Sequence, residues 1–191
     1  MTALTIIGNG PTIDDSTGAF VIGSGGMGVS NGGRSKYSTV PIGSVAYGSM
    51  GTNTATVAGT TFIAELSIGR NITLTGAAVL NGATVGTDKW IYALYNNAGT
   101  LVANTALAGV TTSGANAFQQ IAFTSTYAAT SGRYFLVLQP NGTTDTFRSV
   151  AASTFIDVLG SSATGTFGTL PASITVPTTL TADKAPIGYV Y

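Results

Sequence analysis

The chain contains no histidine and no cysteine, and only 7 basic and 7 acidic residues among 191. Without cysteine it has neither disulfides nor thiolate ligands for a metal. Without histidine it lacks the side chain that titrates nearest neutral pH and serves most often as a general base. We therefore expect a protein that is not an enzyme, with no catalytic residues, no cofactor and no metal ion.

Charge is not only scarce but balanced, because the formal net charge is zero. No basic patch marks a surface for nucleic acid or for an anionic membrane, so we expect neither partner. The N-terminal residues lack the basic region of a signal peptide, and polar residues interrupt both long uncharged stretches, which disfavours a membrane helix. A monomer near zero net charge tends to self-associate, so we expect the chain to work inside an assembly.

Glycine is concentrated near the N-terminus, where residues 23–33 read GSGGMGVSNGG. Such a stretch neither holds a helix nor packs well as a strand. Short apolar pieces flank it, among them Phe20, Val21 and Ile22. A disordered tail is one interpretation, but these side chains favour an arm that becomes ordered against a partner. We predict that residues 1–52 form an extended arm for docking or assembly, and that residues 53–191 form the folded domain.

Strand patterns dominate after residue 52. Residues 61–68 alternate with period two, with Glu65 on the wetter face. Residues 90–95 are apolar on both faces, as in a strand covered on both sides, and the continuous run 134–138 is a candidate central strand. Further strands are predicted at 71–80, 101–104, 118–124, 143–150 (as the partner of 133–139), 154–159, 167–176 and 186–191. Short strands without a helical period predict an all-β antiparallel sandwich, most simply a jelly roll.

Motifs that carry chemistry are weak in this chain. Residues 23–28 fit the glycine pattern of a dinucleotide site, but no helix follows to receive the pyrophosphate. Asp88 in its loop, or Asp145 near Asn141, could bind calcium together with backbone oxygens, although no EF-hand loop is present. Solvated turns and strand edges are the favoured interpretation of the scattered acids. The prediction is accordingly that no metal is bound.

Aromatic residues raise the question of a binding module, because sugars stack on aromatic faces. Tyr92, Tyr95 and Tyr127 are the candidates for stacking a ligand. Packing in the core is the competing interpretation, and it is favoured for Trp90 and Tyr134.

Residues 132–148 read GRYFLVLQPNGTTDTFR, a strand, a turn and a second strand. This unit resembles a stretch seen in small structural proteins of tailed bacteriophages, and the likeness extends over roughly residues 60–150. The Gly-, Thr- and Ala-rich, charge-poor composition is similar to that of phage capsid-decoration and fibre proteins. The resemblance implies a β-sandwich displayed on a virion, often as a trimer, with an arm for docking. It assigns no functional residue.

Two functions follow as hypotheses. In the first, the chain is a non-enzymatic virion protein, a capsid decoration or cement subunit. Its partners would be other virion proteins and further copies of itself, with a homotrimer favoured. In the second, it is a fibre-type module that binds a receptor or a carbohydrate.

Overall fold

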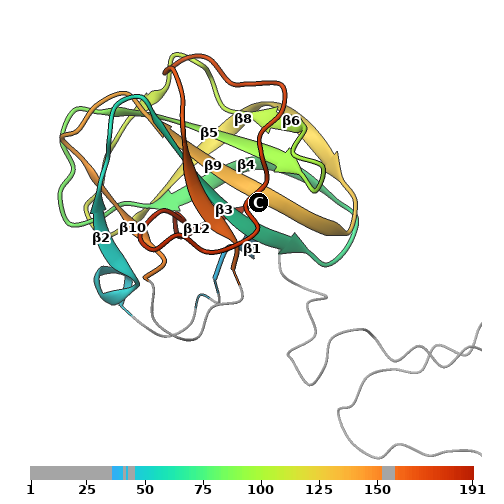
Figure 1. Cartoon of the computed structure of the whole chain (residues 1–191), viewed down its shortest axis with the longest axis horizontal. Helices are drawn as coiled ribbons and strands as arrows, with labels where there is room; N and C mark the ends of the chain where they lie inside the picture. Colours follow the sequence, from blue (N-terminus) through green and yellow to red (C-terminus); the bar gives the residue numbers. More distant parts are fainter. Residues whose placement is uncertain (1–35, 41, 43–45, 152–157) are drawn as a thin grey trace, which may run out of the picture. The chain divides into compact units, whose positions relative to one another are not determined.

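The computed structural model of the protein describes residues 36–40, 42, 46–151 and 158–191 (Figure 1). Within these residues, antiparallel sheets pack together, so the predicted all-β sandwich is confirmed. The jelly-roll topology stays a prediction. Most of the strand predicted at 154–159 lies outside the described residues.

The smaller of the two main sheets has the strand order β1–β12–β4–β8. The larger has the order β11–β3–β9–β5–β6, with β7 also paired to β5, and a separate pair joins β10 to β2. The smaller sheet consists of β1 (Tyr37–Ser38), β12 (Gly188–Val190), β4 (Ile72–Leu80) and β8 (Phe118–Ala129). The larger contains β11 (Gly160–Thr164), β3 (Thr60–Ile68), β9 (Gly132–Pro140), β5 (Lys89–Asn96), β6 (Leu101–Asn104) and β7 (Val110–Thr111). The remaining elements are β2 (Thr52–Ala55), β10 (Thr146–Ser149) and the short 3-10 helix η2 (Tyr47–Ser49).

The two main sheets face each other strand by strand. Strand β1 lies against β3, β12 against β9, β4 against β5 and β8 against β6. The main core fills the space between them, and its largest fully buried side chains include Trp90, Tyr92 and Phe62. Burial of this apolar surface is the main force that holds the layers together.

Three sequence predictions are confirmed by the larger sheet. Strand β3 covers the period-two segment, and on the face predicted to be wetter Glu65 is half-buried and Ser67 is exposed. Strand β5 is buried on both faces from Trp90 to Tyr95. Strand β9 lies between β3 and β5, so the most continuous apolar run is a central strand.

The outer face of the larger sheet is covered by residues 165–180, which we call the C-terminal strap. Leu170, Ile174 and Val176 of the strap pack on the outward side chains of Tyr95 and Phe135. The backbone of the strap bonds to the turn after β5, where the Ile174 N–H donates to the Gly99 carbonyl (2.8 Å). This cover explains why β5 and β9 are apolar on both faces.

Two strand predictions are wrong. Residues 167–176 belong to the strap and make only isolated bridges, because their bonds go to the turn after β5, to Leu101 at the start of β6 and to the Gln139 side chain instead of forming a ladder with one strand. The predicted partner of β9 after the turn 140–142 is β10, which pairs with β2. The chain is diverted there because Thr144 and Asp145, just before β10, bond to the carboxylate of Asp88.

The described residues of the predicted arm pack on the sandwich. Strand β1 pairs with β12, and Met50 is buried in a cluster with Leu80, Val150 and Ile187. Residues 1–35 of the predicted arm lie outside the described residues. Among the residues that are described, no helix has the length and apolar character needed to cross a membrane.

Candidate functional site

Asp88 is the centre of a buried polar cluster that joins three loops. Its Oδ2 accepts hydrogen bonds from the Thr56 hydroxyl (2.9 Å), the Thr144 N–H (3.0 Å) and the Asp145 N–H (3.3 Å). Its Oδ1 accepts one from the Thr144 hydroxyl (2.6 Å). The side chain is only 5% exposed, so these donors replace the water that the carboxylate loses.

The same donors determine how Asp88 titrates. Burial raises the pKa of Asp88, but the hydrogen bonds from Thr144, Thr56 and Asp145 stabilise the charged form more strongly. The net effect is a pKa below the ordinary value of 3.8. The carboxylate is therefore ionised at neutral pH and does not act as a proton donor there.

Asp145 occupies the other side of this cluster. Its Oδ2 accepts a short hydrogen bond from the Thr112 hydroxyl (2.5 Å), and its Oδ1 accepts one from the Gly86 N–H. The structure thus brings together the two acids considered for calcium, whereas Asn141 accepts from the Lys89 N–H instead (2.7 Å). All four carboxylate oxygens are bonded to donors of this chain. The geometry indicates a structural cluster that holds the three loops together, and no metal is assigned to it.

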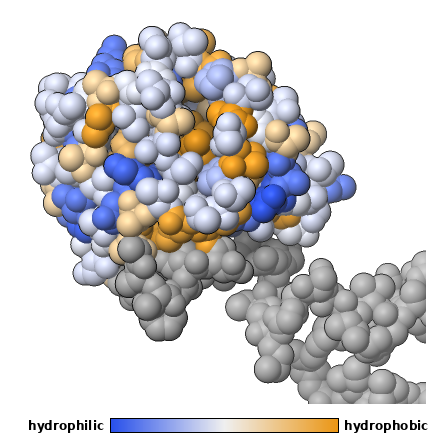
Figure 2. Space-filling model, in the orientation of Figure 1, coloured by the Kyte–Doolittle hydropathy of each residue, from blue (hydrophilic) through white to orange (hydrophobic). Residues whose placement is uncertain are grey.

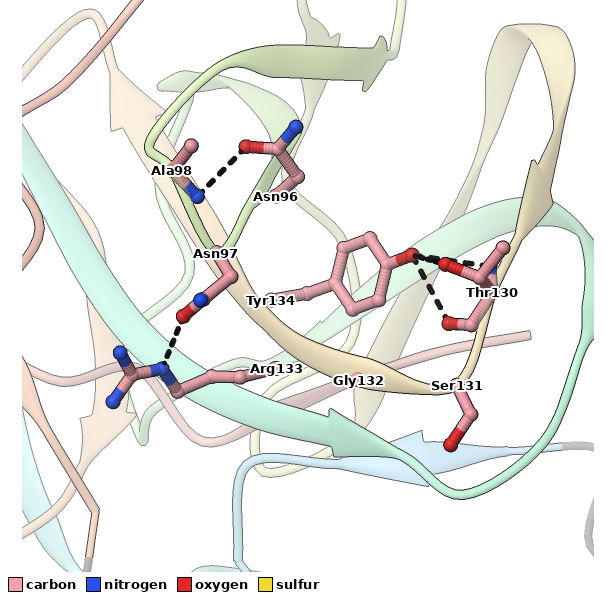
Figure 3. Close-up of a pocket in the computed structure, with 8 residues that line it drawn as sticks. All are labelled: Asn96, Asn97, Ala98, Thr130, Ser131, Gly132, Arg133 and Tyr134. Atoms are coloured by element: carbon pink, nitrogen blue, oxygen red, sulfur yellow. Dashed lines mark hydrogen bonds between the residues drawn. The ribbon is translucent and has the colours of Figure 1, made fainter.

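A surface depression lies at one end of the sandwich, with a volume of about 570 Å³ (Figure 3). The turn after β5 forms one wall, and the turn between β8 and β9 forms the other. Its lining consists of Asn96, Asn97, Ala98, Thr130, Ser131, Gly132, Arg133 and Tyr134. Amide, hydroxyl and guanidinium groups dominate this surface, and the lining contains no carboxylate.

Asn96 fixes the first wall of the depression. Its Oδ1 accepts hydrogen bonds from the N–H groups of Ala98 and Thr100 (both 3.0 Å), which closes the turn. Gly99 completes the turn with φ of +78°, a conformation that glycine adopts without strain. This turn joins β5 to β6, which correspond to the strands predicted at 90–95 and 101–104.

Arg133 supplies the charge of the depression. Its Nε donates to Asn97 Oδ1 (2.6 Å) and lies 3.9 Å from Glu65 Oε1. The guanidinium also lies over the ring of Phe135, 5.6 Å from the centroid. In Figure 3 the two terminal nitrogens point away from Asn97. The side chain is 41% exposed, so these nitrogens are accessible to an anionic or hydroxyl-bearing ligand.

Tyr134 joins the second wall to the core. Its hydroxyl accepts from the Thr130 N–H (3.1 Å) and donates to the Thr130 carbonyl (3.1 Å). Its ring is buried and packs edge-on against Tyr127 (centroids 6.2 Å apart). Burial raises the pKa of Tyr127 to about 12, and the neighbouring Tyr134 adds to the shift. The Tyr127 hydroxyl is therefore neutral at neutral pH.

The aromatic side chains predicted to stack on a ligand are not a binding surface. Tyr92 and Tyr95 have no exposed area, because the smaller sheet covers one face of β5 and the strap covers the other. The stacking prediction is therefore wrong for both. Tyr127 is partly buried against the core, and the core interpretation is confirmed for Trp90 and Tyr134. Among the residues that the structure describes, Tyr47 is the large aromatic side chain that is exposed, and it packs edge-on against Phe118.

Sequence reasoning missed the depression itself. Asn96 and Asn97 fall between the strands predicted at 90–95 and 101–104, and Arg133 is the first residue of the strand predicted at 133–139. Their meeting depends on the pairing of β5 with β9, which places Asn96 opposite Tyr134. No local sequence pattern indicates that β5 pairs with β9. Searches against protein-family models, curated proteins and solved structures found no match to this chain.

Proposed function

We propose that this chain is a non-enzymatic structural protein of a virion, a decoration or cement subunit that docks on neighbouring subunits through residues 1–35. The observation that carries the proposal is the position of β1. This strand is at the edge of the smaller sheet, and the glycine-rich residues 1–35 directly precede Lys36 and β1. An edge strand pairs with a neighbour on one side only. The chain that precedes it is therefore not held between two strands and can extend to another molecule.

The chemistry of the surface supports the same function. The face seen in Figure 2 is mostly pale or orange, with few strongly hydrophilic residues. Several large apolar side chains of the described residues are exposed, among them Val57, Leu107 and Val110. Contacts made by such a surface gain roughly 25 cal/mol per Å² of apolar area and depend little on ionic strength.

Removal of residues 1–35 tests the proposal. The full chain is expected to sediment with capsids that lack it, whereas residues 36–191 bind at least about tenfold more weakly, a loss of about 1.4 kcal/mol or more. Circular dichroism of the truncated chain checks that the sandwich is intact. Equal binding by both forms, or loss of binding at moderate salt, contradicts docking through the arm. Sedimentation equilibrium of the full chain tests the expected homotrimer.

The second candidate function is binding of a receptor glycan, and the depression of Figure 3 is the observation that favours it. Its exposed guanidinium and side-chain amides match the hydroxyl and carboxylate groups of an acidic sugar. The stacking residues predicted for this function are core residues, so the depression would have to bind through hydrogen bonds.

Substitution of Arg133 by alanine tests this candidate on a glycan array. Saturable binding to acidic glycans is expected to fall at least about tenfold, because a hydrogen bond to a charged group contributes about 1.5–3 kcal/mol. Thr73→Ala, an exposed change on β4, is the matched control and should leave binding unchanged. Binding that survives in Arg133→Ala, or no binding to any glycan, excludes the depression as a glycan site.

A further inference from the structure

A groove of about 480 Å³ runs between β11 and the C-terminal strap. Its lining has no charged residue and includes the apolar side chains of Ile63, Ile174 and Val176. The rest of the lining is small and polar, mainly serine and threonine from Ser161–Thr164 and Ser173–Thr179. The groove is thus long, uncharged and open to apolar side chains.

The backbone of β11 points polar groups into this groove. The Gly160 N–H donates to the Thr179 carbonyl (3.2 Å), and the Gly160 carbonyl accepts from the Thr181 N–H (2.7 Å). The backbone groups of Gly160 therefore point away from β3. Because backbone direction alternates along a strand, Ser162 and Thr164 point theirs the same way. The strap pairs with β11 at one position, Gly160, and the groove separates it from residues 161–164 of β11. The backbone groups of Ser162 and Thr164 are therefore available to an added strand.

The segment that precedes Lys36 continues into β1. Strand β1 lies against the inner face of β3, and β3 pairs with β11, the edge strand of the larger sheet. Residues 19–22 (Ala-Phe-Val-Ile) are uncharged and have the composition of a strand. The glycine-rich residues 23–35 that follow can span up to about 45 Å when extended, enough to reach a neighbouring molecule.

We infer that residues 19–22 of one copy add as a strand to β11 of a neighbouring copy, within this groove. The N–H and C=O groups of Ser162 and Thr164 provide the ladder, which is the general mode of β-strand addition. Alternate side chains of the added strand then face Ile174 and Val176, which determines its register. The inference rests on the proposed function, since it specifies where the docking arm binds.

Disulfide trapping tests this pairing in a chain that has no cysteine of its own. Ala163→Cys on one copy is mixed with Ala19→Cys, Phe20→Cys, Val21→Cys or Ile22→Cys on another. A paired strand brings Cα atoms within the roughly 4.4–6.8 Å that a disulfide requires. The strongest intermolecular cross-link is expected at the one position of residues 19–22 that lies directly opposite residue 163, with a weaker one two residues away on the same face and none at the positions between them. Thr73→Cys on β4 is the matched control and should give no alternating pattern.

Other cross-linking results overturn the inference. Equal cross-linking at all four positions indicates random collision instead of a strand. A cross-link formed only within one copy, in the variant that carries both cysteines, places the segment on its own sandwich. No cross-link above the Thr73→Cys control excludes the groove as the docking site.

Ser162→Pro tests the ladder by a second route. The Ser162 N–H points away from β3, so proline removes the donor into the groove without removing a bond to β3. Assembly of the full chain is expected to weaken at least tenfold, whereas Ser162→Ala, which keeps the N–H, leaves it unchanged. Equal assembly by the two variants overturns the inference. The cysteine variants keep the backbone intact and provide the test where proline disturbs β11.

The two proposals fail in different ways. If residues 36–191 lose assembly but position 163 shows no alternating cross-link, the arm docks elsewhere and only the groove is excluded. If residues 36–191 assemble as well as the full chain, docking through the arm is itself excluded.

Discussion

Replacement of Asp88 by alanine is expected to lower the free energy of unfolding by about 2–4 kcal/mol. The carboxylate accepts four hydrogen bonds, and one of the donors, the Asp145 N–H, belongs to a buried residue. A buried donor left without an acceptor costs about 1–3 kcal/mol, and a hydrogen bond to a charged group contributes about 1.5–3 kcal/mol. The Thr56 hydroxyl keeps the Asp145 carbonyl as an acceptor (3.0 Å), and the exposed Thr144 regains water. Urea unfolding followed by circular dichroism measures the loss.

Asp88→Asn is the matched control for this prediction. It keeps one oxygen as an acceptor and the shape of the side chain, so its loss of stability should be smaller than that of alanine. If the alanine variant loses less than about 1 kcal/mol, water has replaced the carboxylate and the cluster does not hold the loops together.

The same residue gives the protein a dependence on pH. The pKa of Asp88 is below 3.8 in the folded protein and near its ordinary value when unfolded. The stabilisation is therefore complete above the unfolded pKa and is lost as pH falls through the folded one. Stability of the native chain should decline below about pH 4, and Asp88→Asn should flatten this decline. An unchanged pH profile in Asp88→Asn assigns the acid sensitivity to other carboxylates.

Gly188→Ala is expected to destabilise the fold by about 3 kcal/mol, a typical cost of overpacking a core. A Cβ at Gly188 would lie 2.5 Å from the Ala78 carbonyl oxygen and 2.5 Å from Leu136 Cδ2. On the other side, the Thr39 N–H donates to the Gly188 carbonyl (2.9 Å), so β12 cannot move without disturbing β1. The expected fall in Tm is roughly 6–12 °C.

Gly48→Ala serves as the control, because its Cβ would meet only the side chain of Asn116, at 3.3 Å. A surface change of this kind should alter stability by less than about 0.5 kcal/mol. Scanning calorimetry of both variants distinguishes steric crowding at β12 from a general cost of replacing glycine. Equal Tm values for the two variants would show that β12 accommodates the methyl group.

The local hydrophobic pattern was sufficient to predict where most strands lie in the sequence, but not which strands pair with each other. The alternation around Glu65 and the apolar run of β9 were recognisable because burial repeats along each strand. The pairing of β10 with β2 was not, because it depends on Asp88, more than fifty residues away in sequence from Thr144. The strap was mistaken for a strand because Ile174 and Val176 have strand composition, although they pack on a sheet face.

The candidate site was less predictable than the fold. Tyr92 and Tyr95 were considered for a ligand surface although their strand was predicted to be covered on both faces, because the sequence does not identify the elements that cover it. The strap buries Tyr95, and its hydroxyl donates to the Pro171 carbonyl (2.9 Å), a contact between residues far apart in the chain. Arg133 and Asn97 meet for a similar reason, through the pairing of β5 with β9.

The strap follows in the chain the strands that it covers, and this order has a consequence for synthesis of the protein. Strands β3, β5 and β9 leave the ribosome before residues 165–180, so Ile63, Phe135 and Val137 have no cover on their outer side until the strap has been made. Exposed apolar sheet surface is prone to aggregation during this interval. A nascent chain released before the strap is made would therefore expose the apolar outer face of the larger sheet, and we expect chaperones to bind it.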